Sequence, residues 1–358
     1  MGKEPQILVI NPGSTSTKLS VFRGREEIHS ETLYHSAEEL ARFPRVTDQY
    51  PLRVRVIEES LARNGFEQDG FDAIVARGGL LHPLEGGTYR INEKMVQELL
   101  EARYGEHASN LGAIIAWNLS RKRGIPAFIV DPVVVDEMEE IARLSGLPEL
   151  PRKSIFHALN QKAVDRKAAE KLGKKYNEVN VIVAHMGGGI TVGLHRQGRV
   201  VDVNNGLDGE GPYTPERTGS LPVGDLIRLC FSGKYTREEM LRKNKGQGGV
   251  VAYLGTNDMR EVERRALAGD PWWRLVYEGM AYQVAKEIGA LSTVVAGKVD
   301  AIVLTGGVAH SELFVGWIRD RVSFLAPVFV FPGEMEMEAL ALGAYRVLIG
   351  EEQAKEYV

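Results

Sequence analysis

Several segments of the chain combine glycine with hydroxyl or cationic side chains, a combination that suits the oxygens of a phosphate group. The richest segment runs from Asn11 to Lys18, where serines and threonines supply hydroxyl donors and the lysine supplies a positive charge. Glycines add backbone N–H groups that can face an anion, because no side chain blocks its approach. Similar clusters are Arg77-Gly78-Gly79, Gly187-Gly188-Gly189 and Gly306-Gly307. Each cluster alone is explained by a tight turn, but the four together favour a nucleotide site.

These clusters lack the common nucleotide and zinc motifs. No glycine cluster continues to Gly-Lys-Ser or Gly-Lys-Thr, and none has the spacing Gly-x-Gly-x-x-Gly. Cysteines and histidines do not gather at zinc spacing, so a hard cation with oxygen ligands, such as Mg²⁺, is the metal to expect. The candidate ligands are Asp131, Glu334, Glu336 and Glu338, and the candidate cations for a phosphoryl group are Lys18, Arg77 and Arg217.

Two further side chains could have either a chemical or a structural role. His157 lies just before a predicted helix, and a lone histidine is more often structural than catalytic. Cys230 is the one cysteine of the chain and lies in the apolar run 226–231, so we interpret it as a core residue and not as a nucleophile.

The chemistry-bearing clusters follow short apolar runs that predict buried strands. Strands are predicted over 7–10, 19–22, 71–76, 127–130, 181–185, 190–194, 301–304 and 328–331. Helices are predicted over 92–103, 109–122 with Ser109 as N-cap, 160–172, 260–267, 272–295 and 336–349. Strands that alternate with helices predict an α/β fold, in which ligands gather beyond the carboxyl ends of strands. The pattern of strand, glycine turn and strand occurs around both Gly13 and Gly188, which indicates an internal duplication with a boundary near 150–155.

Composition narrows the class of protein. A chain of 358 residues with 44% hydrophobic residues is long enough for two domains. Its net charge of −4 argues against nucleic-acid binding through bulk charge. No apolar stretch is long enough to span a bilayer, and the first residues lack the pattern of a signal peptide, so no membrane partner and a cytoplasmic location are expected. A homo-oligomer, at least a dimer, is expected, and the aromatic helix at 272–295 is either its interface or a buried core helix.

The clusters, in their order along the chain, resemble the acetate and butyrate kinases, carboxylate kinases of the superfamily of sugar kinases, heat-shock ATPases and actin. Residues 10–18 resemble the opening signature of that family, and residues 183–189 resemble its second phosphate loop. Residues 257–260 and 305–309 resemble its adenosine-contacting segments.

The resemblance implies a fold and an activity. The fold would be two duplicated domains of βββαβαβα type, the actin-like ATPase fold, with the active site in an interdomain cleft. Residues 1–152 plus 339–358 would form the carboxylate and phosphate domain, and residues 153–338 the nucleotide domain. The activity would be the reversible, Mg²⁺-dependent, in-line transfer of the γ-phosphoryl group of ATP to a short-chain carboxylate, giving an acyl phosphate and ADP.

The resemblance also implies roles for individual residues. Arg77 would hold the carboxylate, Asp131 would be the catalytic aspartate, and His157 would contact the transition state. Arg217 is the nearest stand-in for a further catalytic arginine of the family. Asn11 and Glu338 match the magnesium positions. The implied nucleotide contacts are Asn11, Ser14, Ser16, Lys18, His185, Gly187, Gly188, Gly189, Asp258, Met259, Arg260, Gly306, Gly307 and Ala309.

Departures from the acetate kinase pattern point to a branch of the family. No arginine precedes Gly224-Asp225, and Gln161 stands where acetate kinases have a second histidine. Together with Pro12, these departures favour butyrate as the substrate. Isobutyrate, propionate and acetate remain alternatives, as do an actin-like ATPase and a sugar kinase that uses Asp131 as a base.

Overall fold

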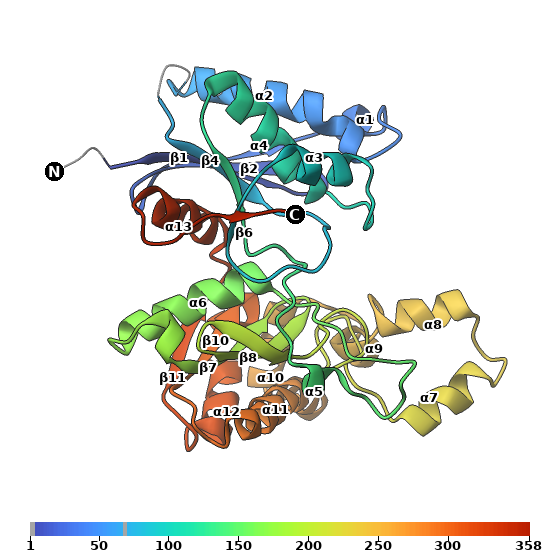
Figure 1. The fold of residues 1–358 in the computed structure, drawn as a ribbon. Coiled ribbons are helices and arrows are strands. Elements are labelled where there is room, and N and C mark those ends of the chain that lie inside the picture. The colour runs from blue at the N-terminus through green and yellow to red at the C-terminus, as the bar shows by residue number, and fades with distance from the viewer. Residues whose placement is uncertain (1–3, 67–69) are drawn as a thin grey trace. The chain divides into compact units, whose positions relative to one another are not determined.

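The fold is known from a computed structural model, which describes residues 4–66 and 70–358. The chain forms two compact units. The first reaches up to Asp136 and includes Met335–Val358, and the second is Glu137–Glu334. Each unit contains a mixed β-sheet flanked by helices, which confirms the predicted α/β class (Figure 1).

Within its described residues, the sheet of the first unit has seven strands in the order β12-β5-β6-β4-β1-β2-β3. Helices α2 and α4 lie on one face of this sheet and α13 lies on the other (Figure 1). The strands are β1 Gln6–Pro12, β2 Ser16–Arg23, β3 Glu26–Tyr34, β4 Ala73–Arg77, β5 Thr88–Arg90, β6 Ala127–Val130 and β12 Lys355–Glu356. The helices are α1 Ala37–Leu40, η1 Thr47–Gln49, α2 Tyr50–Arg63, α3 Glu93–Leu100, α4 Asn110–Arg123 and α13 Glu336–Leu348.

The second unit has a five-stranded sheet in the order β11-β10-β7-β8-β9. Its strands are β7 Asn180–Met186, β8 Ile190–Arg196, β9 Arg199–Val203, β10 Ala301–Gly306 and β11 Val328–Pro332. Its longer helices are α6 Ala158–Lys171, α7 Val223–Cys230, α8 Arg237–Asn244, α10 Met259–Leu267, α11 Pro271–Ser292 and α12 Glu312–Val322. The short helices are α5 Glu140–Arg143, η2 Tyr176–Glu178, α9 Gly249–Leu254, η3 Thr293–Val295 and η4 Gly307–His310.

The two sheets share one strand pattern, as the predicted duplication requires. β1 pairs antiparallel with β2 and parallel with β4, and β7 pairs in the same way with β8 and β10. Both first strands have seven residues, and both are followed by a connection of the same length, 13–15 and 187–189. The glycine clusters therefore occupy equivalent turns of two equivalent hairpins.

The central strands are buried on both faces, as expected of strands covered by helices on either side. Ile7, Leu8, Val9 and Ile10 are fully buried in the first unit, and Val181, Ile182, Val183 and Ala184 in the second. In residues 4–66 and 70–358, no helix is both long enough and apolar enough for a membrane crossing.

Three local predictions need correction. Ser109 precedes α4 but already has helical backbone angles, and its side chain does not cap the helix. Helix α3 ends at Leu100 and not at Arg103, because the chain turns sharply at Ala102, where φ is 50°.

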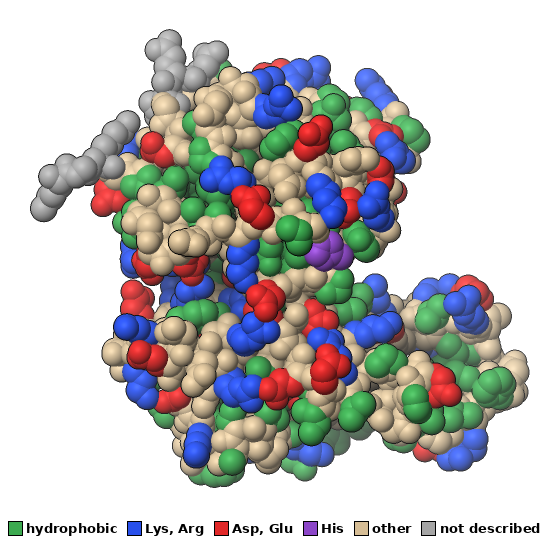
Figure 2. Space-filling model, in the orientation of Figure 1, with side chains coloured by type: hydrophobic (Ala, Val, Ile, Leu, Met, Phe, Trp, Pro, Cys, Tyr) green, Lys and Arg blue, Asp and Glu red, His purple; other side chains and the backbone are tan. Residues whose placement is uncertain are grey.

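The interpretation of Cys230 as a core residue was also wrong, because this cysteine is exposed. Helix α7 contains no buried residue, and the side chain of Phe231 beyond its end is 87% exposed. The apolar pattern of α7 therefore corresponds to a hydrophobic face that the residues described by the structure leave uncovered. Figure 2 shows hydrophobic side chains gathered on the projecting part of the second unit that carries α7 and α8. The helix at 272–295 is by contrast largely core, with Val276, Met280 and Val284 buried, while Trp272 at its start is half exposed.

Candidate functional site

In the first unit, three predicted site residues lie at the carboxyl ends of three neighbouring strands. Asn11 lies near the end of β1, Arg77 ends β4, and Asp131 directly follows β6. The strands are in register there, since Ile10 pairs with Ala76 and Arg77 pairs with Val130. Side chains that are distant in the sequence therefore meet at one edge of the sheet, which is where ligands bind in such folds.

Glu336 joins two of these residues. It lies in the first turn of α13, where the helix dipole favours an acidic side chain. Its carboxylate lies 3.0 Å from Arg77 Nη1 and accepts a hydrogen bond of 2.6 Å from Asn11 Nδ2. Among the acidic candidates, Glu336 thus contacts Asn11, Glu338 lies in the same turn of α13, and Glu334 belongs to the second unit.

Asp131 is held in an uncommon backbone conformation. Its φ is 39°, a left-handed value that is sparsely populated for residues other than glycine. Its Oδ1 accepts a hydrogen bond of 2.6 Å from the backbone N–H of Gly87, and its own N–H donates to Gly87 O at 3.0 Å. The side chain is 5% exposed. Such strained residues persist where the surroundings fix them, and they cluster at functional sites.

The hairpin loop after β1 is held by an arginine that the sequence analysis missed. Arg53 of α2 is fully buried, and its guanidinium donates to the carbonyl oxygens of Gly13, Ser14 and Ser16. Burial lowers the pKa of Arg53 to about 10. Its sequence position offered a signal, because Arg53 lies four residues before the buried Ile57, on the apolar stripe of the helix. Ser14 and Lys18 are exposed, and Lys18 pairs with Asn11 across the hairpin.

In the second unit, the glycine loop after β7 packs against the predicted arginine. The hydroxyl of Thr214 donates to Gly188 O at 2.7 Å, and Arg217 Nη1 donates to Gly206 O at 2.6 Å. A Cβ atom on Gly189 would lie 2.2 Å from Arg217 Nη1, whereas one on Gly188 would meet nothing closer than 3.7 Å. A side chain at Gly189 would therefore displace the guanidinium of Arg217, whereas one at Gly188 would make only an ordinary contact. Burial lowers the pKa of Arg217.

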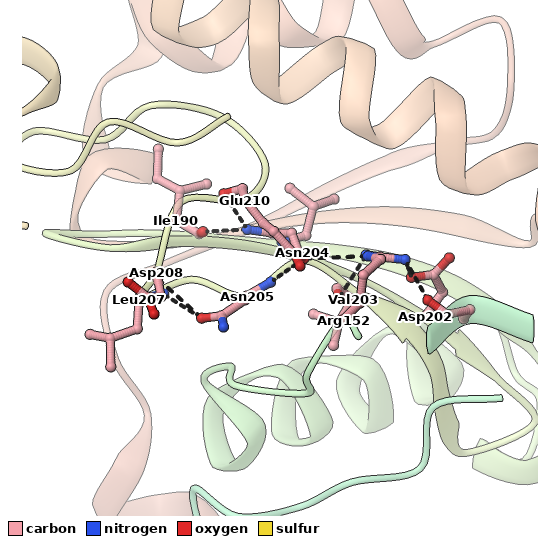
Figure 3. Close-up of polar contacts among 11 residues, drawn as sticks. Arg152, Ile190, Asp202, Val203, Asn204, Asn205, Leu207, Asp208 and Glu210 are labelled. Carbon is pink, nitrogen blue, oxygen red and sulfur yellow. Dashed lines mark hydrogen bonds and ion pairs between the residues drawn. The ribbon is translucent and has the colours of Figure 1, made fainter. Parts of the chain in front are cut away.

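The loop that supplies Gly206 is itself fixed by polar contacts (Figure 3). Asn204 accepts a hydrogen bond of 2.7 Å from Val192 N and donates to Ile190 O at 3.1 Å, which ties the loop to the start of β8. Glu210 accepts from Asn205 N at 3.0 Å and lies 3.4 Å from Arg152 Nε. Arg152 also pairs with Asp202 at 2.9 Å. The loop whose Gly206 oxygen accepts from Arg217 is therefore anchored on both sides of that residue.

The cluster Arg77-Gly78-Gly79 has a different explanation from the one that its glycines suggested. A Cβ atom on Gly78 would lie 2.5 Å from Pro132, and one on Gly79 would lie 2.6 Å from the backbone of Asn110 in α4. Neither glycine has a positive φ. These two glycines are required because neighbouring segments pack closely on them, so they carry no argument for a phosphate site.

His157 and His185 form a stacked pair in the second unit. Their ring centroids lie 3.8 Å apart with an interplanar angle of 11°. His185 is 1% exposed and lies 2.8 Å from Asn160 Oδ1 through Nδ1. Burial, together with the adjacent His157 ring, holds the pKa of His185 well below its usual range. A neutral His185 removes the charge repulsion that would otherwise oppose the stack.

The two predicted adenosine-contacting segments are linked to each other. Asp258 caps α10 by accepting from Arg260 N at 3.0 Å, and Gly306 ends β10 before η4. The hydroxyl of Ser311, just beyond η4, donates to Glu263 of α10 at 2.5 Å. Gly306 has a φ of 87° and packs on the backbone of Met186, so this segment also borders the second glycine loop. The remaining predicted residues, Met259, Gly307 and Ala309, lie in these same elements.

Each unit thus brings together its own share of the predicted site. Arg53, Asn160 and Thr191, whose hydroxyl lies 2.9 Å from His157 Nδ1, are contact residues that sequence reasoning missed. Thr191 could have been found from hairpin pairing, because it lies opposite His185. Asn160 carried no signal in the sequence. In the described part of the chain, no three His, Cys, Asp or Glu side chains converge as a metal site.

Comparison with known proteins identifies the family of this chain. A model described as the Acetokinase family matches residues 149–338. Butyrate kinase 2 of Clostridium acetobutylicum is 55% identical over 352 residues, which cover 98% of this chain and 99% of that protein.

Solved structures agree on the fold. The acetate kinase of Porphyromonas gingivalis matches with a TM-score of 0.78 at 19% identity, over 96% of this chain and 100% of the other. A propionate kinase of Francisella tularensis matches with a TM-score of 0.72 at 20% identity, over 94% of this chain and 98% of the other. These matches confirm the predicted fold of the acetate kinases. Given the family match and a relative of 55% identity over almost all of both chains, the protein belongs to the acetokinase family.

Proposed function

We propose that this protein is a butyrate kinase, which transfers the γ-phosphoryl group of ATP reversibly to butyrate and forms butyryl phosphate and ADP. The observation that carries the proposal is the 55% identity to Butyrate kinase 2 over almost the entire length of both proteins. The attacking carboxylate already bears its charge, so the step needs no general base. Catalysis then depends on orientation and on stabilisation of the charge that spreads over the moving phosphoryl group.

The first unit offers a cation for the carboxylate. Arg77 is more than a third exposed and keeps its guanidinium at the strand ends through Glu336. We propose that Arg77 binds the carboxylate of butyrate, because guanidinium groups suit planar carboxylates. Asp131, fixed by Gly87, would help to orient the reacting groups.

The second unit offers donors for the phosphoryl group and contacts for the nucleotide. His157 and Arg217 would donate to the equatorial oxygens of the phosphoryl group. The backbone at Gly187 and Gly188 would approach the phosphates, since a Cβ atom at either position would meet nothing closer than 3.5 Å. The segments 258–260 and 306–309 would contact the adenosine.

The residues present also fit a magnesium ion. Asn11 and the acidic residues in the first turn of α13, Glu336 and Glu338, offer the oxygen donors that Mg²⁺ prefers. We propose that Asn11 and Glu338 hold the ion, with Glu336 orienting the amide of Asn11. When bound with ATP, the ion would neutralise charge on the β- and γ-phosphates.

A trapping assay tests the proposal. The purified protein is incubated with MgATP, hydroxylamine and one acceptor at a time, and acyl hydroxamate is measured against ADP release. Butyrate, isobutyrate, propionate and acetate are compared, with glucose as a hydroxyl acceptor. We expect hydroxamate with butyrate at the highest kcat/KM. A higher kcat/KM for another acid would reassign the substrate, and ADP release without any hydroxamate would refute carboxylate phosphorylation.

We also propose that the protein self-associates and acts in the cytoplasm. The uncovered apolar face of α7 supports self-association, with Ile227 53% exposed and Phe231 87% exposed on a helix that has no buried residue. A second copy of this chain is the proposed partner for that face. The domain boundaries at residues 152/153 and 338/339 are likewise proposed, and limited proteolysis can test them.

A further inference from the structure

A chain of polar contacts leads from His157 into the interior of the second unit. His157 Nδ1 lies 2.9 Å from Thr191 Oγ1, and Gln161 Nε2 lies 2.8 Å from the same hydroxyl. Gln161 Oε1 lies 3.1 Å from His195 Nε2, and His195 Nδ1 lies 3.0 Å from Asp165 Oδ2. The four residues beyond His157 are all fully buried.

The positions of these residues in α6 and β8 explain the chain of contacts. His157, Gln161 and Asp165 are spaced by four residues along one face of α6, with His157 at its N-cap. Thr191 and His195 point to the same face of β8, with Gly193 between them. A Cβ atom on Gly193 would lie 2.6 Å from Gln161 Oε1, so the glycine gives the amide its space.

The contacts fix the direction of each hydrogen bond. Gln161 Nε2 also donates to the backbone oxygen of Thr191 at 3.0 Å, and a carbonyl oxygen can only accept. The amide oxygen of Gln161 must therefore face His195, whose Nε2 carries a hydrogen. His195 Nδ1 lies close to the carboxylate of Asp165 without hydrogen-bond geometry, so the far end of the chain is a buried pair and the orientation of the amide is set by its contacts with Thr191.

The same logic sets the hydrogen of His157. The Thr191 hydroxyl accepts from Gln161, so its own hydrogen is available to the ring nitrogen of His157 at 2.9 Å. When Thr191 donates this hydrogen, both polar groups are satisfied, Nδ1 of a neutral His157 is the acceptor, and the ring hydrogen lies on Nε2. We propose that Thr191, Gln161, His195 and Asp165 are positioning residues that hold His157 in the Nε2–H tautomer, the form that can donate a hydrogen bond through Nε2 to a phosphoryl oxygen. The effect on turnover rests on the proposed function, but the tautomer does not.

The test is the variant Thr191→Val, which replaces the hydroxyl group of Thr191 by a methyl group. The backbone oxygen of residue 191 still accepts a hydrogen bond from Gln161 in this variant. Thr191→Ser should restore the contact. Thr88→Val is the matched control, because Thr88 is 2% exposed in the other unit and its hydroxyl has no hydrogen-bond partner. The readout is the ¹⁵N spectrum of the histidine rings at a pH where they are neutral, and His157 is assigned among the eight histidines by the signal lost in His157→Gln.

We expect the wild-type protein, Thr191→Ser and Thr88→Val to show the Nε2–H tautomer of His157, and Thr191→Val to show a mixture of tautomers. We also expect Thr191→Val to lower kcat by at least tenfold and up to about 10³-fold, the loss typical of one such donor, with the KM values for ATP and butyrate little changed. An Nδ1–H tautomer in the wild-type protein would overturn the inference, as would an unchanged tautomer in Thr191→Val. A tautomer that responds as expected in a protein that phosphorylates no acid would leave the inference standing and refute the proposed function.

Discussion

Replacing Arg53 should loosen the hairpin loop at residues 13–15, although Arg53 itself lies in α2. Its guanidinium makes five hydrogen bonds of 2.8–3.1 Å, all to uncharged oxygen atoms. Two of these acceptors, Thr17 Oγ1 and Gln49 Oε1, belong to buried side chains. The other three are loop carbonyls, which can turn to solvent when the arginine is lost.

The magnitude follows from the two buried acceptors. At about 1–3 kcal/mol for each acceptor left without a donor, and with His35 still in contact with Thr17, Arg53→Met should lower the free energy of unfolding by about 2–4 kcal/mol. Arg53→Lys should lose less, because an ammonium group keeps the charge but cannot span the loop and Gln49 together. A displaced loop should also lower kcat/KM in the trapping assay, since a shift of about 1 Å can cost roughly 10²-fold.

Arg55 supplies the control, because it lies in the same helix with 66% of its side chain exposed and only a 3.8 Å pair with Glu59. Arg55→Met should lose less than about 0.5 kcal/mol, the usual range of such a pair. Urea unfolding and the hydroxamate assay at a temperature where all variants are folded give both readouts. A loss below about 1 kcal/mol in Arg53→Met, or an equal loss in Arg55→Met, would refute the argument, because two buried acceptors should cost more than that.

Four further outcomes are expected. Arg77→Ala should lower kcat by roughly 10³–10⁵-fold, and a loss of less than about threefold would remove Arg77 from the site. Gly189→Ala should displace Arg217 and lower kcat. Gly188→Ala should fold normally but weaken ATP binding in calorimetry, and an unchanged Kd for this variant would contradict the proposed phosphate contact. The pKa of His185 in the folded protein lies below the unfolded value of about 6.5, so the unfolded chain takes up the proton first as the pH drops. The free energy of unfolding should therefore fall as the pH drops through about 6.5. That fall should be steeper than in His185→Asn by up to about 1.4 kcal/mol per pH unit, and equal slopes in urea titrations from pH 7 to 5 would argue against a buried neutral ring. Phe231→Asp should reduce the mass of the particle in light scattering, and an unchanged mass would exclude α7 as the contact between copies.

The sequence predicted strand ends well because the relevant signal is local. A β-branched run followed by glycine or a polar residue, as at Val183 and Gly187, specifies a strand and its exit without any distant contact. The same locality limits the prediction. Helix α7 has an amphipathic pattern as clear as that of a core helix, and no local feature says whether its apolar face is covered, so Cys230 was misplaced.

The glycine clusters illustrate the same limit in another form. Gly78 and Gly188 look alike in the sequence, and both follow a strand. The structure separates them, because a Cβ atom on Gly78 would lie 2.5 Å from Pro132, while one on Gly188 would make only an ordinary contact at 3.7 Å. A glycine required for packing and a glycine that leaves room for a ligand differ only in what another segment places nearby.

The sequence by itself determined the α/β class, the duplication and the family, since strand runs, repeated turns and ordered motifs are carried by neighbouring residues. Only the tertiary structure decided that Glu336 meets Asn11, that Arg53 holds a loop forty residues away, and that Gln161 faces His195. Those contacts join residues that are far apart along the chain or on different elements. Their distances are set by how the helices pack on each sheet, and no local pattern of amino acids encodes that packing.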